Sequence, residues 1–197
     1  MSDPAAMAMK AGLRERYRRL RRALDPQRAA SEAASTVARC LDLVSAAPAL
    51  ASYLALADEL DPGDLHRAWW STGRPLYVPR VCGPGRLTWH LLRADDVPGL
   101  GAFGIREPDP LQSPACELPA RAAVIVPGIA FASDGRRLGQ GAGYYDRALA
   151  THRGLTIGVG YSCQRCDDLP VEPHDRAVSA VVLGGEVLRV PPDTLPA

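Results

Sequence analysis

The sequence predicts an α/β fold with a mostly parallel sheet, and three observations support this prediction. Short apolar runs rich in β-branched residues recur along the chain, as expected for strands buried on both faces. Helical or polar stretches separate these runs, which favours an alternation of strands and helices. The chain has 197 residues and is 47% hydrophobic, which suffices for one substantial core, so we expect a single domain over residues 1–197.

Two helices are expected before the first strand, over about residues 10–46. Apolar residues recur at helical spacing from Leu13 to Leu24, and a neighbouring stripe is basic. This stripe consists of Lys10, Arg14, Arg18 and Arg21. A second helix starts at Asp25 and Pro26, because aspartate caps a helix N-terminus and proline suits its first turn. Pro48 ends this second helix.

An α/β core is expected over about residues 49–190. The apolar runs predict strands over residues 50–57, 75–81, 87–92, 122–126, 155–160 and 178–183. Further helices are expected over about residues 64–71 and 144–151. The stretch 95–119 is rich in proline and glycine and has no period, which predicts a long ordered connection. In such a fold the strand ends face a shared crevice, and long connections of this kind often line sites.

Bulk composition narrows the classes of function. The 23 basic and 22 acidic residues nearly cancel, so no overall field attracts nucleic acid or an anionic membrane. No signal peptide or run of 18 apolar residues is present, and we expect a cytoplasmic protein. The odd number of cysteines favours reduced thiols. Cys163 and Cys166 have the spacing of a metal or redox pair, but no second close pair completes a zinc site.

The stretch from Arg136 to Arg147 carries the clearest chemical signal. It contains glycines at three alternate positions, Gly139, Gly141 and Gly143. Such glycines let the backbone approach a ligand closely and point successive N–H groups into one concavity, which suits phosphate oxygens. A helix that begins just after Gly143 adds its positive end. The pattern therefore predicts a phosphate-binding loop.

Charged neighbours of these glycines favour a nucleoside triphosphate with a divalent cation. Arg136 and Arg137 can neutralise a polyphosphate, and Asp146, in the first helical turn, can hold Mg²⁺. The stretch is not a Walker A loop, since no Gly-Lys-Ser/Thr follows. It is not a dinucleotide fingerprint either, since Asp146 stands in the place of the third glycine. A flexible surface turn before an amphipathic helix is the alternative interpretation.

Residues 137–147 read RLGQGAGYYDR, a string that closely resembles the signature of the 5-formyltetrahydrofolate cyclo-ligases, also called methenyltetrahydrofolate synthetases. Other landmarks of this family occur in the same order, at residues 10–14, 54–59, 78–80, 104–108 and 173–175. The likeness spans about residues 10–183, so it bears on the fold as well as on the site.

The resemblance implies a three-layer α/β/α sandwich of the group shared by sugar-phosphate isomerases and CoA transferases. It also implies a ligase that forms a carbon–nitrogen bond. The reaction closes 5-formyltetrahydrofolate to 5,10-methenyltetrahydrofolate and converts ATP to ADP and phosphate, through phosphorylation of the formyl oxygen and attack by N10. The implied partners are small molecules, ATP and a reduced folate, with Mg²⁺ as cofactor. We expect a monomer or weak homodimer.

Carried over residue by residue, the resemblance assigns three sets of contacts. The residues implied to contact ATP are Lys10, Arg14, Arg137, Leu138, Gly139, Gln140, Gly141, Ala142, Gly143, Tyr144 and Tyr145. Those implied to contact the folate are Leu54, Glu59, Phe103, Gly104, Ile105, Glu107, Gln140, Gly141, Gly143 and Tyr144. Asp146 and Asp175 are implied to hold Mg²⁺.

Some positions allow other interpretations or depart from the family. Without the resemblance Leu54 would be read as core and Glu59 as surface, and a packing role suits Phe103 and Ile105 equally well. Ser179 stands where family members commonly carry an acidic residue, and Ala142 stands where glycine or lysine is usual. Neither departure affects a residue expected to bind the metal.

Two other functions are compatible with parts of the sequence. A sugar-phosphate isomerase or CoA transferase on the same fold also uses a phosphate-binding glycine loop. An RNA- or protein-binding module could use the basic stripe of the first helix, with strongly salt-dependent binding. We favour the cyclo-ligase, because a basic stripe explains neither the three glycines nor Asp146.

Overall fold

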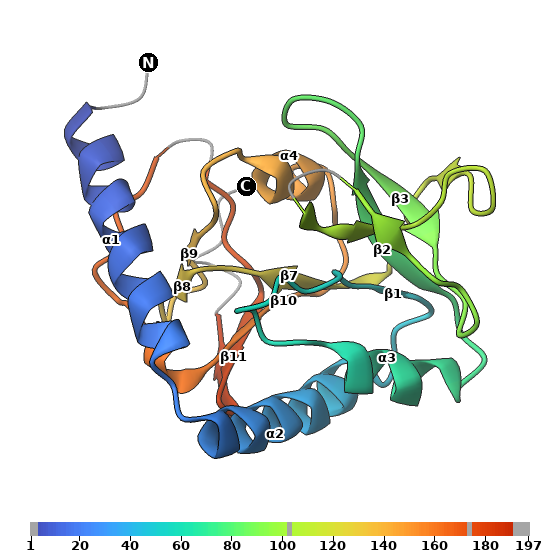
Figure 1. Cartoon of the computed structure of the whole chain (residues 1–197), viewed down its shortest axis with the longest axis horizontal. Coiled ribbons are helices and arrows are strands. Elements are labelled where there is room, and N and C mark those ends of the chain that lie inside the picture. The colour runs from blue at the N-terminus through green and yellow to red at the C-terminus, as the bar shows by residue number, and fades with distance from the viewer. Residues whose placement is uncertain (1–3, 102–103, 173–174, 191–197) are drawn as a thin grey trace.

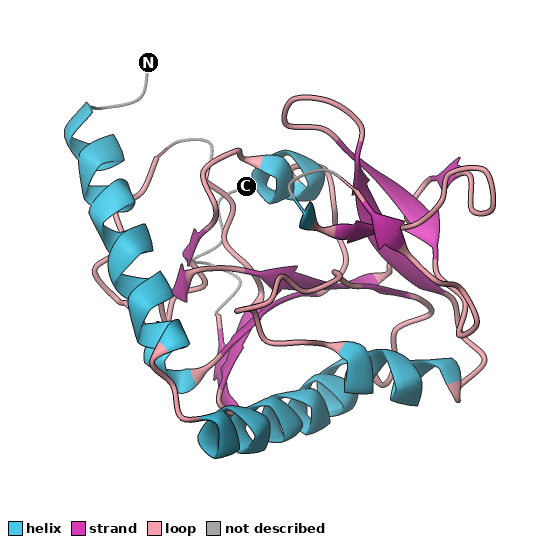
Figure 2. Ribbon diagram, in the orientation of Figure 1, coloured by secondary structure: helices cyan, strands magenta, loops and turns pink. Residues whose placement is uncertain are grey.

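A computed structural model describes residues 4–101, 104–172 and 175–190, and a mixed eight-stranded sheet lies at its centre (Figures 1 and 2). In spatial order the strands are β12 (Glu186–Arg189), β11 (Ala180–Leu183), β10 (Thr156–Gly160), β7 (Ala123–Pro127), β1 (Leu50–Ala51), β2 (Leu76–Val81), β3 (Leu87–Leu91) and β6 (Ala115–Cys116). From β11 to β2 neighbouring strands run parallel, whereas β12, β3 and β6 pair antiparallel at the two edges. The predicted α/β fold with a mostly parallel sheet is confirmed.

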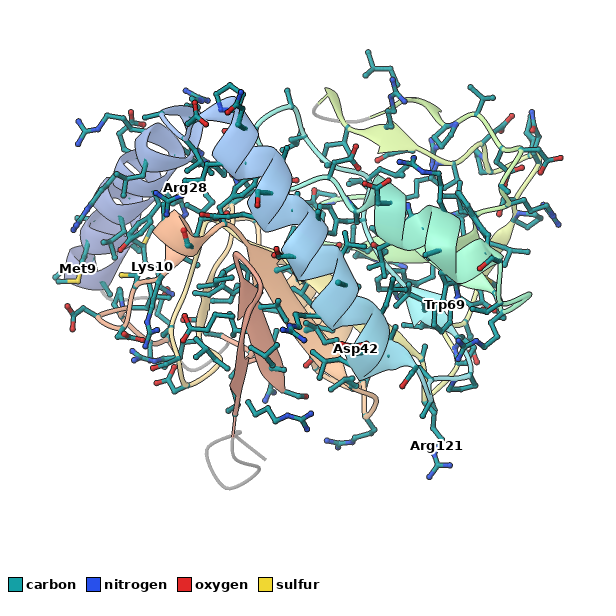
Figure 3. The ribbon with its side chains drawn as sticks, turned by 90° about the horizontal axis from the view of Figure 1, so that it is seen from below. Met9, Lys10, Arg28, Asp42, Trp69 and Arg121 are labelled. Carbon is teal, nitrogen blue, oxygen red and sulfur yellow. The ribbon has the colours of Figure 1, made fainter. Side chains whose placement is uncertain are left out.

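Helices cover both faces of this sheet. They are α1 (Pro4–Arg22), α2 (Pro26–Val44), α3 (Gly63–Trp70) and α4 (Tyr144–Leu149), with a short 3-10 helix η2 (Ser162–Gln164). In Figure 1 α2 and α3 lie below the sheet and α4 above it, which gives three layers. Figure 3 looks onto the lower face, with Asp42 of α2 and Trp69 of α3 labelled. Within the described residues, no helix is both long enough and apolar enough to cross a bilayer.

The alternation of side chains along β7 builds a core on each face. Ile125 packs into a cluster with Trp69 of α3 and residues of α2, whereas Val124 packs into a second cluster with Leu149 of α4 and Phe131. This two-sided burial explains why the strand is apolar without interruption. The alternating pattern therefore fixes which helices flank which face.

A third cluster attaches α1 to the rest of the protein. Tyr17 packs against the hairpin formed by β8 (Ala130–Phe131) and β9 (Arg137–Leu138), and Leu13 lies beside it. The hydroxyl of Tyr17 donates to the carbonyl of Arg165 at 3.0 Å. The first helix is thereby held next to the stretch that follows β9, which is the predicted phosphate-binding loop.

The two N-terminal helices are present as predicted, although α1 begins at Pro4 instead of about residue 10. The side chain of Asp25 accepts from the backbone N–H groups of Gln27 and Arg28 at 3.1 and 3.0 Å, so the predicted cap of the second helix is confirmed. Two residues of the basic stripe of the first helix are buried. Lys10 and Arg21 are 7% and 5% exposed, because both side chains turn toward carboxylates of the protein.

Several strand boundaries differ from the prediction. The first strand ends at Ala51 instead of residue 57, because the chain leaves the sheet and turns at Leu56, whose carbonyl accepts from the N–H of Glu59 at 2.9 Å. The stretch 95–119 contains short strands β4 (Gly99–Leu100), β5 (Arg106–Glu107) and β6 instead of an unbroken connection. The edge strand β12 was not predicted. Gly184 and Gly185, with φ of 57° and 92°, form the tight turn before it.

We expect Gly158→Ala to lower the free energy of unfolding by about 1–3 kcal/mol, as overpacked cores do. A Cβ at this position of β10 would lie 2.4 Å from a ring carbon of the buried Phe131. Gly12→Ala is the matched control, since nothing lies within 4 Å of its Cβ on the exposed side of α1. There alanine should stabilise by about 0.5–1 kcal/mol. Denaturant unfolding measures both changes, and equal stability of the two variants would contradict this packing.

Candidate active site

A pocket of about 480 Å³ opens where β1, β2 and β7 end. Its wall includes Leu54 just after β1, Val81 at the end of β2, and Pro127 at the end of β7. Parallel strands direct their carboxyl ends to one edge of a sheet, which is where α/β proteins bind ligands. A pocket therefore lies at the carboxyl ends of the parallel strands.

Most of the predicted site residues meet in this pocket. Those lining it are Lys10, Arg14, Leu54, Glu59, Ile105, Glu107, Arg137, Leu138, Gly139, Gln140, Gly141, Ala142, Gly143, Tyr144, Tyr145, Asp146 and Asp175. Gly104 does not line it, and Phe103 lies outside the described residues. Segments separated by more than a hundred residues are therefore brought together, although contact with a ligand stays a prediction for each residue.

The glycine loop joins β9 to α4, and its glycines are required for two different reasons. Gly141 and Gly143 have φ of 109° and 66°, a region that other residues rarely adopt, and Gly143 is the N-cap of α4. The φ of Gly139 lies outside this region, but a Cβ there would lie 2.6 Å from Nη1 of Arg137. The helix begins directly after Gly143, as predicted, so its N-terminus faces the loop.

Side chains of α1 hold this loop from outside. Nε of Arg14 donates to the carbonyl oxygen of Gly139 at 2.9 Å, and Nη2 of Arg18 donates to Oε1 of Gln140 at 2.6 Å. Burial lowers the pKa of Arg14, and the nearby charge of Arg18 adds to this effect. Arg14 and Arg18 of the basic stripe therefore bind the glycine loop, whereas Lys10 and Arg21 pair with carboxylates.

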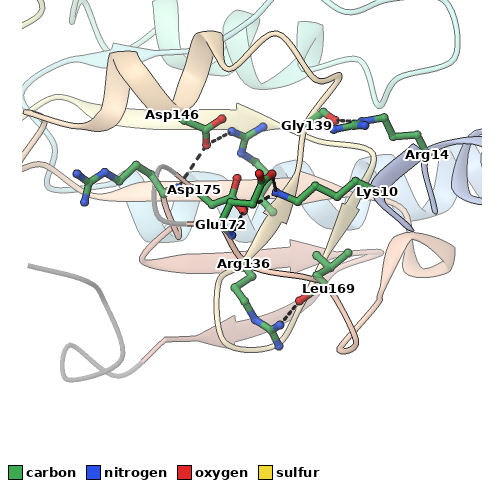
Figure 4. A network of polar contacts seen from close by, with 10 residues as sticks. Lys10, Arg14, Arg136, Gly139, Asp146, Leu169, Glu172 and Asp175 are labelled. Carbon is green, nitrogen blue, oxygen red and sulfur yellow. Dashed lines mark hydrogen bonds and ion pairs between the residues drawn. The ribbon is translucent and has the colours of Figure 1, made fainter. Parts of the chain in front are cut away.

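Arg136 is not part of the pocket, and its predicted role at a polyphosphate is wrong. Its guanidinium group donates to the carboxylate of Asp134 at 2.6 Å and to the carbonyl oxygen of Asp167 at 2.7 Å. A further bond reaches the carbonyl oxygen of Leu169, as Figure 4 shows. Arg136 directly precedes β9, and these bonds hold its side chain away from the pocket that Arg137 and Leu138 line.

Lys10 lies between two carboxylates (Figure 4). Its Nζ is 2.7 Å from Oε2 of Glu172 and 2.6 Å from Oδ2 of Asp175. Burial lowers the pKa of Lys10, but the hydrogen bonds and charges of Asp175 and Glu172 outweigh this, and the pKa lies above its usual value. Glu172 was not predicted as a site residue, although it stands only three positions before Asp175.

Asp146 forms the second buried ion pair of the pocket. Its Oδ1 accepts from Nη2 of Arg137 at 2.8 Å and from the backbone N–H of Arg176 at 3.3 Å. The second bond brings Asp146 next to the segment that carries Asp175. Within the described residues, no group of three or more His, Cys, Asp or Glu side chains could hold a metal ion. Two carboxylates are nonetheless the usual protein share of a Mg²⁺ site that phosphate oxygens and water complete.

Comparison with known proteins identifies the family. The sequence profile of the 5-formyltetrahydrofolate cyclo-ligase family matches residues 6–184. The chain belongs to this cyclo-ligase family. It is 31% identical over 178 residues to the 5-formyltetrahydrofolate cyclo-ligase of Escherichia coli, covering 86% of this chain and 97% of that protein. It is 40% identical over 82 residues to the enzyme of the same name from Mycolicibacterium smegmatis, covering 41% of this chain and 42% of that protein.

A solved cyclo-ligase-family structure shares the fold. The 5,10-methenyltetrahydrofolate synthetase of Aquifex aeolicus superposes with a TM-score of 0.79 at 29% identity, and the match covers 92% of this chain and 93% of the other. The recognised family is therefore confirmed by sequence and by structure. The likeness to sugar-phosphate isomerases and CoA transferases stays a prediction.

The cyclo-ligase pocket has a second wall, on the side of the residues assigned to the folate. Oε2 of Glu59 accepts from the N–H of Leu56 at 3.1 Å, and Oε1 is 3.4 Å from Nε2 of Gln140 in the glycine loop. Burial raises the pKa of Glu59. Oε1 of Glu107 accepts from the N–H of Val81 at 3.1 Å, so this carboxylate also fixes the end of β2.

The two departures from the cyclo-ligase pattern have different surroundings. The hydroxyl of Ser179 is 3.1 Å from that of Thr156, within the sheet and away from the pocket lining. Ala142 lies in the pocket wall.

Other residues that line the pocket were not predicted: Met7, Ala11, Tyr53, Leu56, Pro79, Val81, Leu87, Arg106, Pro127, Gly128, Arg147 and Glu172. Most are apolar or at strand ends, where a wall residue and a core residue look alike in sequence.

We expect Tyr145→Phe to weaken substrate binding up to about tenfold without loss of stability. The Tyr145 hydroxyl is buried, lines the pocket and has no hydrogen-bond partner among the described residues, and burial raises its pKa. A ligand that supplies the partner gains about 0.5–1.5 kcal/mol, whereas deleting an unsatisfied hydroxyl costs the fold nothing. KM values for both substrates and the melting temperature test this. A less stable variant with unchanged KM would contradict it.

Proposed function

We propose that this pocket catalyses the ATP-dependent cyclisation of 5-formyltetrahydrofolate to 5,10-methenyltetrahydrofolate, with release of ADP and phosphate. The observation that carries the proposal is the meeting, in one pocket, of the glycine loop with buried cations and carboxylates. Family membership supports it, because relatives that align over nearly their whole length are named 5-formyltetrahydrofolate cyclo-ligase.

The triphosphate would bind along the glycine loop. Lys10, Arg14 and Arg137 bring three cationic side chains to one side of the pocket, and the N-terminus of α4 points into the same space. Phosphoryl transfer depends mainly on positioning and on neutralising the charge of the transferred group. These residues suit both tasks, and no protein nucleophile is needed.

Asp146 and Asp175 would hold Mg²⁺, and the chemistry of these donors fits that ion. When bound, the ion neutralises phosphate charge and orients the transferred group. In the structure each carboxylate is paired with a cation assigned to the nucleotide, Asp146 with Arg137 and Asp175 with Lys10. On binding, the phosphates would take over these cations, which would leave Asp146 and Asp175 free to hold the metal. The internal ion pairs thus keep the charges in place for both ligands.

The reduced folate would occupy the wall built from Leu54, Glu59 and Ile105. Leu54 and Ile105 offer apolar surface, and the Glu59 carboxyl can exchange hydrogen bonds with the N–H groups of the pterin edge. The hydrogen bond between Gln140 and Glu59 places this wall next to the glycine loop. The formyl oxygen can therefore lie beside the γ-phosphate. Contacts with Phe103 and Gly104 rest on the family resemblance alone.

Two chemical steps lead from the substrates to the products. The formyl oxygen attacks the γ-phosphorus, and the bond from that phosphorus to the β,γ-bridging oxygen breaks, which releases ADP. The phosphorylated oxygen is now a good leaving group. The N10 lone pair then forms a bond to the formyl carbon, the carbon–oxygen bond breaks with release of phosphate, and N10 loses its proton. The protein contributes orientation and exclusion of water, which bring N10 close to the formyl carbon.

Two alternative functions make different demands on the site. A sugar-phosphate isomerase or CoA transferase consumes no ATP. A nucleic-acid-binding module needs its basic residues at the surface, but Lys10 and Arg21 are buried against carboxylates. The cyclo-ligase reaction accounts for the glycine loop, the cations and the carboxylates together.

The direct test of the proposed function mixes the protein with Mg²⁺, ATP and 5-formyltetrahydrofolate. We expect the absorbance of methenyltetrahydrofolate to grow only when all three are present, with one ADP formed for each product molecule. A coupled assay measures the ADP. ADP release that does not depend on the folate, or no product at any enzyme concentration, would reject the proposal.

We expect Asp146→Asn to lower Mg²⁺-dependent turnover by at least about 100-fold, since a catalytic metal supplies several kcal/mol of transition-state stabilisation. The fold should persist, because asparagine can still accept from Arg137 and from the N–H of Arg176. Cys163→Ser is the control and should retain full turnover, since Cys163 lies in η2 and does not line the pocket. Full turnover in the Asp146 variant would contradict the metal assignment.

A further inference from the structure

Arg147 connects two parts of the pocket that are far apart in the sequence. From the last turn of α4, its Nε donates to the carbonyl oxygen of Gly85 at 2.7 Å, and its Nη2 donates to the carbonyl oxygen of Ala142. Gly85 belongs to the turn between β2 and β3, and Ala142 belongs to the glycine loop. Among the described residues no carboxylate pairs with Arg147, so its guanidinium group serves these two carbonyls.

The turn from Cys82 to Arg86 is shaped to receive this guanidinium group. The N–H of Cys82 donates to the carbonyl of Arg86 at 3.0 Å, and the N–H of Arg86 donates to the carbonyl of Gly83 at 3.1 Å. Gly85 has φ of 67°, and a Cβ there would lie 1.9 Å from Nη2 of Arg147. No other residue fits this approach without displacing the arginine.

The bond to Ala142 orients the glycine loop. In a trans peptide the C=O and the N–H point in opposite directions. An arginine that binds the carbonyl of Ala142 therefore turns the N–H of Gly143 to the opposite side of the peptide plane. In the same way, the bond from Arg14 to the carbonyl of Gly139 turns the N–H of Gln140 to the opposite side of its peptide plane. Both carbonyls, which would repel a phosphate, are thus bound by guanidinium groups.

The two connected parts belong to different walls. The glycine loop is the wall assigned to ATP, whereas β2 and β3 supply Pro79, Val81 and Leu87 to the opposite wall. Val81 and Leu87 flank the turn that Arg147 holds, and Val81 also binds Glu107 of the folate side. Arg147 therefore links the two walls directly, in addition to the hydrogen bond between Gln140 and Glu59.

We propose that Arg147 is a positioning residue that couples the nucleotide and folate half-sites. This inference rests on the proposed function and extends it. Nucleotide binding orders the glycine loop, the loop fixes Arg147 through Ala142, and Arg147 fixes the β2–β3 turn beside the folate. The order of binding is immaterial, since coupling between two sites is reciprocal.

The test measures binding, without turnover, by isothermal titration calorimetry. The probe is Mg²⁺ with an ATP analogue that has a non-hydrolysable β,γ-imido bridge, titrated with and without saturating 5-formyltetrahydrofolate. In the wild-type protein we expect the folate to lower the Kd of the analogue by about fivefold or more, the lower end of ordinary coupling between sites. In Arg147→Lys this factor should fall below about twofold. The lysine ammonium group is a compact charge and lacks the planar, forked set of donors with which a guanidinium group binds two carbonyls.

A second variant perturbs the same contact from the other side. Gly85→Ala places its Cβ against the guanidinium group and should abolish the coupling as Arg147→Lys does, and the double variant should show no further loss. Gly83→Ala is the matched control in the same turn. Its φ of 138° also disfavours alanine, but nothing lies within 4 Å of its Cβ, so coupling should persist.

Three results would overturn the proposal: absence of coupling in the wild-type protein, coupling retained in Arg147→Lys, or equal loss in Gly83→Ala and Gly85→Ala. The last would assign the effect to strain in the turn. Failure of the proposed function looks different, since the wild-type protein would then form no methenyltetrahydrofolate. A wild-type enzyme that turns over normally, with coupling unaffected by Arg147→Lys, rejects only the role of Arg147.

Discussion

The ion pairs that balance charge inside the pocket are the constraint on which the rest of the site depends. Lys10 lies between Glu172 and Asp175, and Arg137 pairs with Asp146. Buried charges without partners are costly, so each pair stabilises both of its members when no ligand is bound. In the proposed function, the same pairs would let the site recognise a metal–phosphate complex as one unit. Phosphate alone would leave the carboxylates without cations, and metal alone would leave the cations without anions.

The fold brings these charges together from elements that are distant in sequence. The apolar contacts of Tyr17 hold α1 against the β8–β9 hairpin, which places Lys10 beside Glu172 and Asp175, and Arg14 beside Gly139. The glycine loop leaves that hairpin and enters α4, whose Leu149 packs into the core on the upper face of the sheet. Rigid packing on both sides of the loop fixes its position, while its glycines allow the close approach of backbone to ligand. Strand ends of the sheet supply the floor of the pocket.

Much of this arrangement was predictable, because the signals were local. Apolar runs indicated most strands of the sheet, Asp25 marked the start of α2, and the glycines indicated the start of α4.

Features that depend on contacts between residues distant in sequence were not predicted. Arg136 and Arg137 look alike in sequence, and only contacts of the folded chain separate them, since Arg136 pairs with Asp134 outside the pocket and Arg137 pairs with Asp146 inside it. Glu172 becomes a site residue through Lys10, which lies 162 positions away. Arg147 stands in the recognised signature string, but its contacts with Gly85 and Ala142 exist only in the folded chain. The first strand was predicted too long because its apolar residues continue into the pocket wall.

The central claim is that Mg²⁺–ATP binds by exchange with the internal ion pairs around the glycine loop. A crystal structure with Mg²⁺ and a non-hydrolysable ATP analogue tests it most directly. The account predicts the triphosphate against the backbone from Gly139 to Gly143, with Nζ of Lys10 on a phosphate oxygen and the carboxylates of Asp146 and Asp175 turned to the metal. A nucleotide bound elsewhere, or a triphosphate in the pocket with the Lys10–Asp175 and Arg137–Asp146 pairs intact, would contradict it.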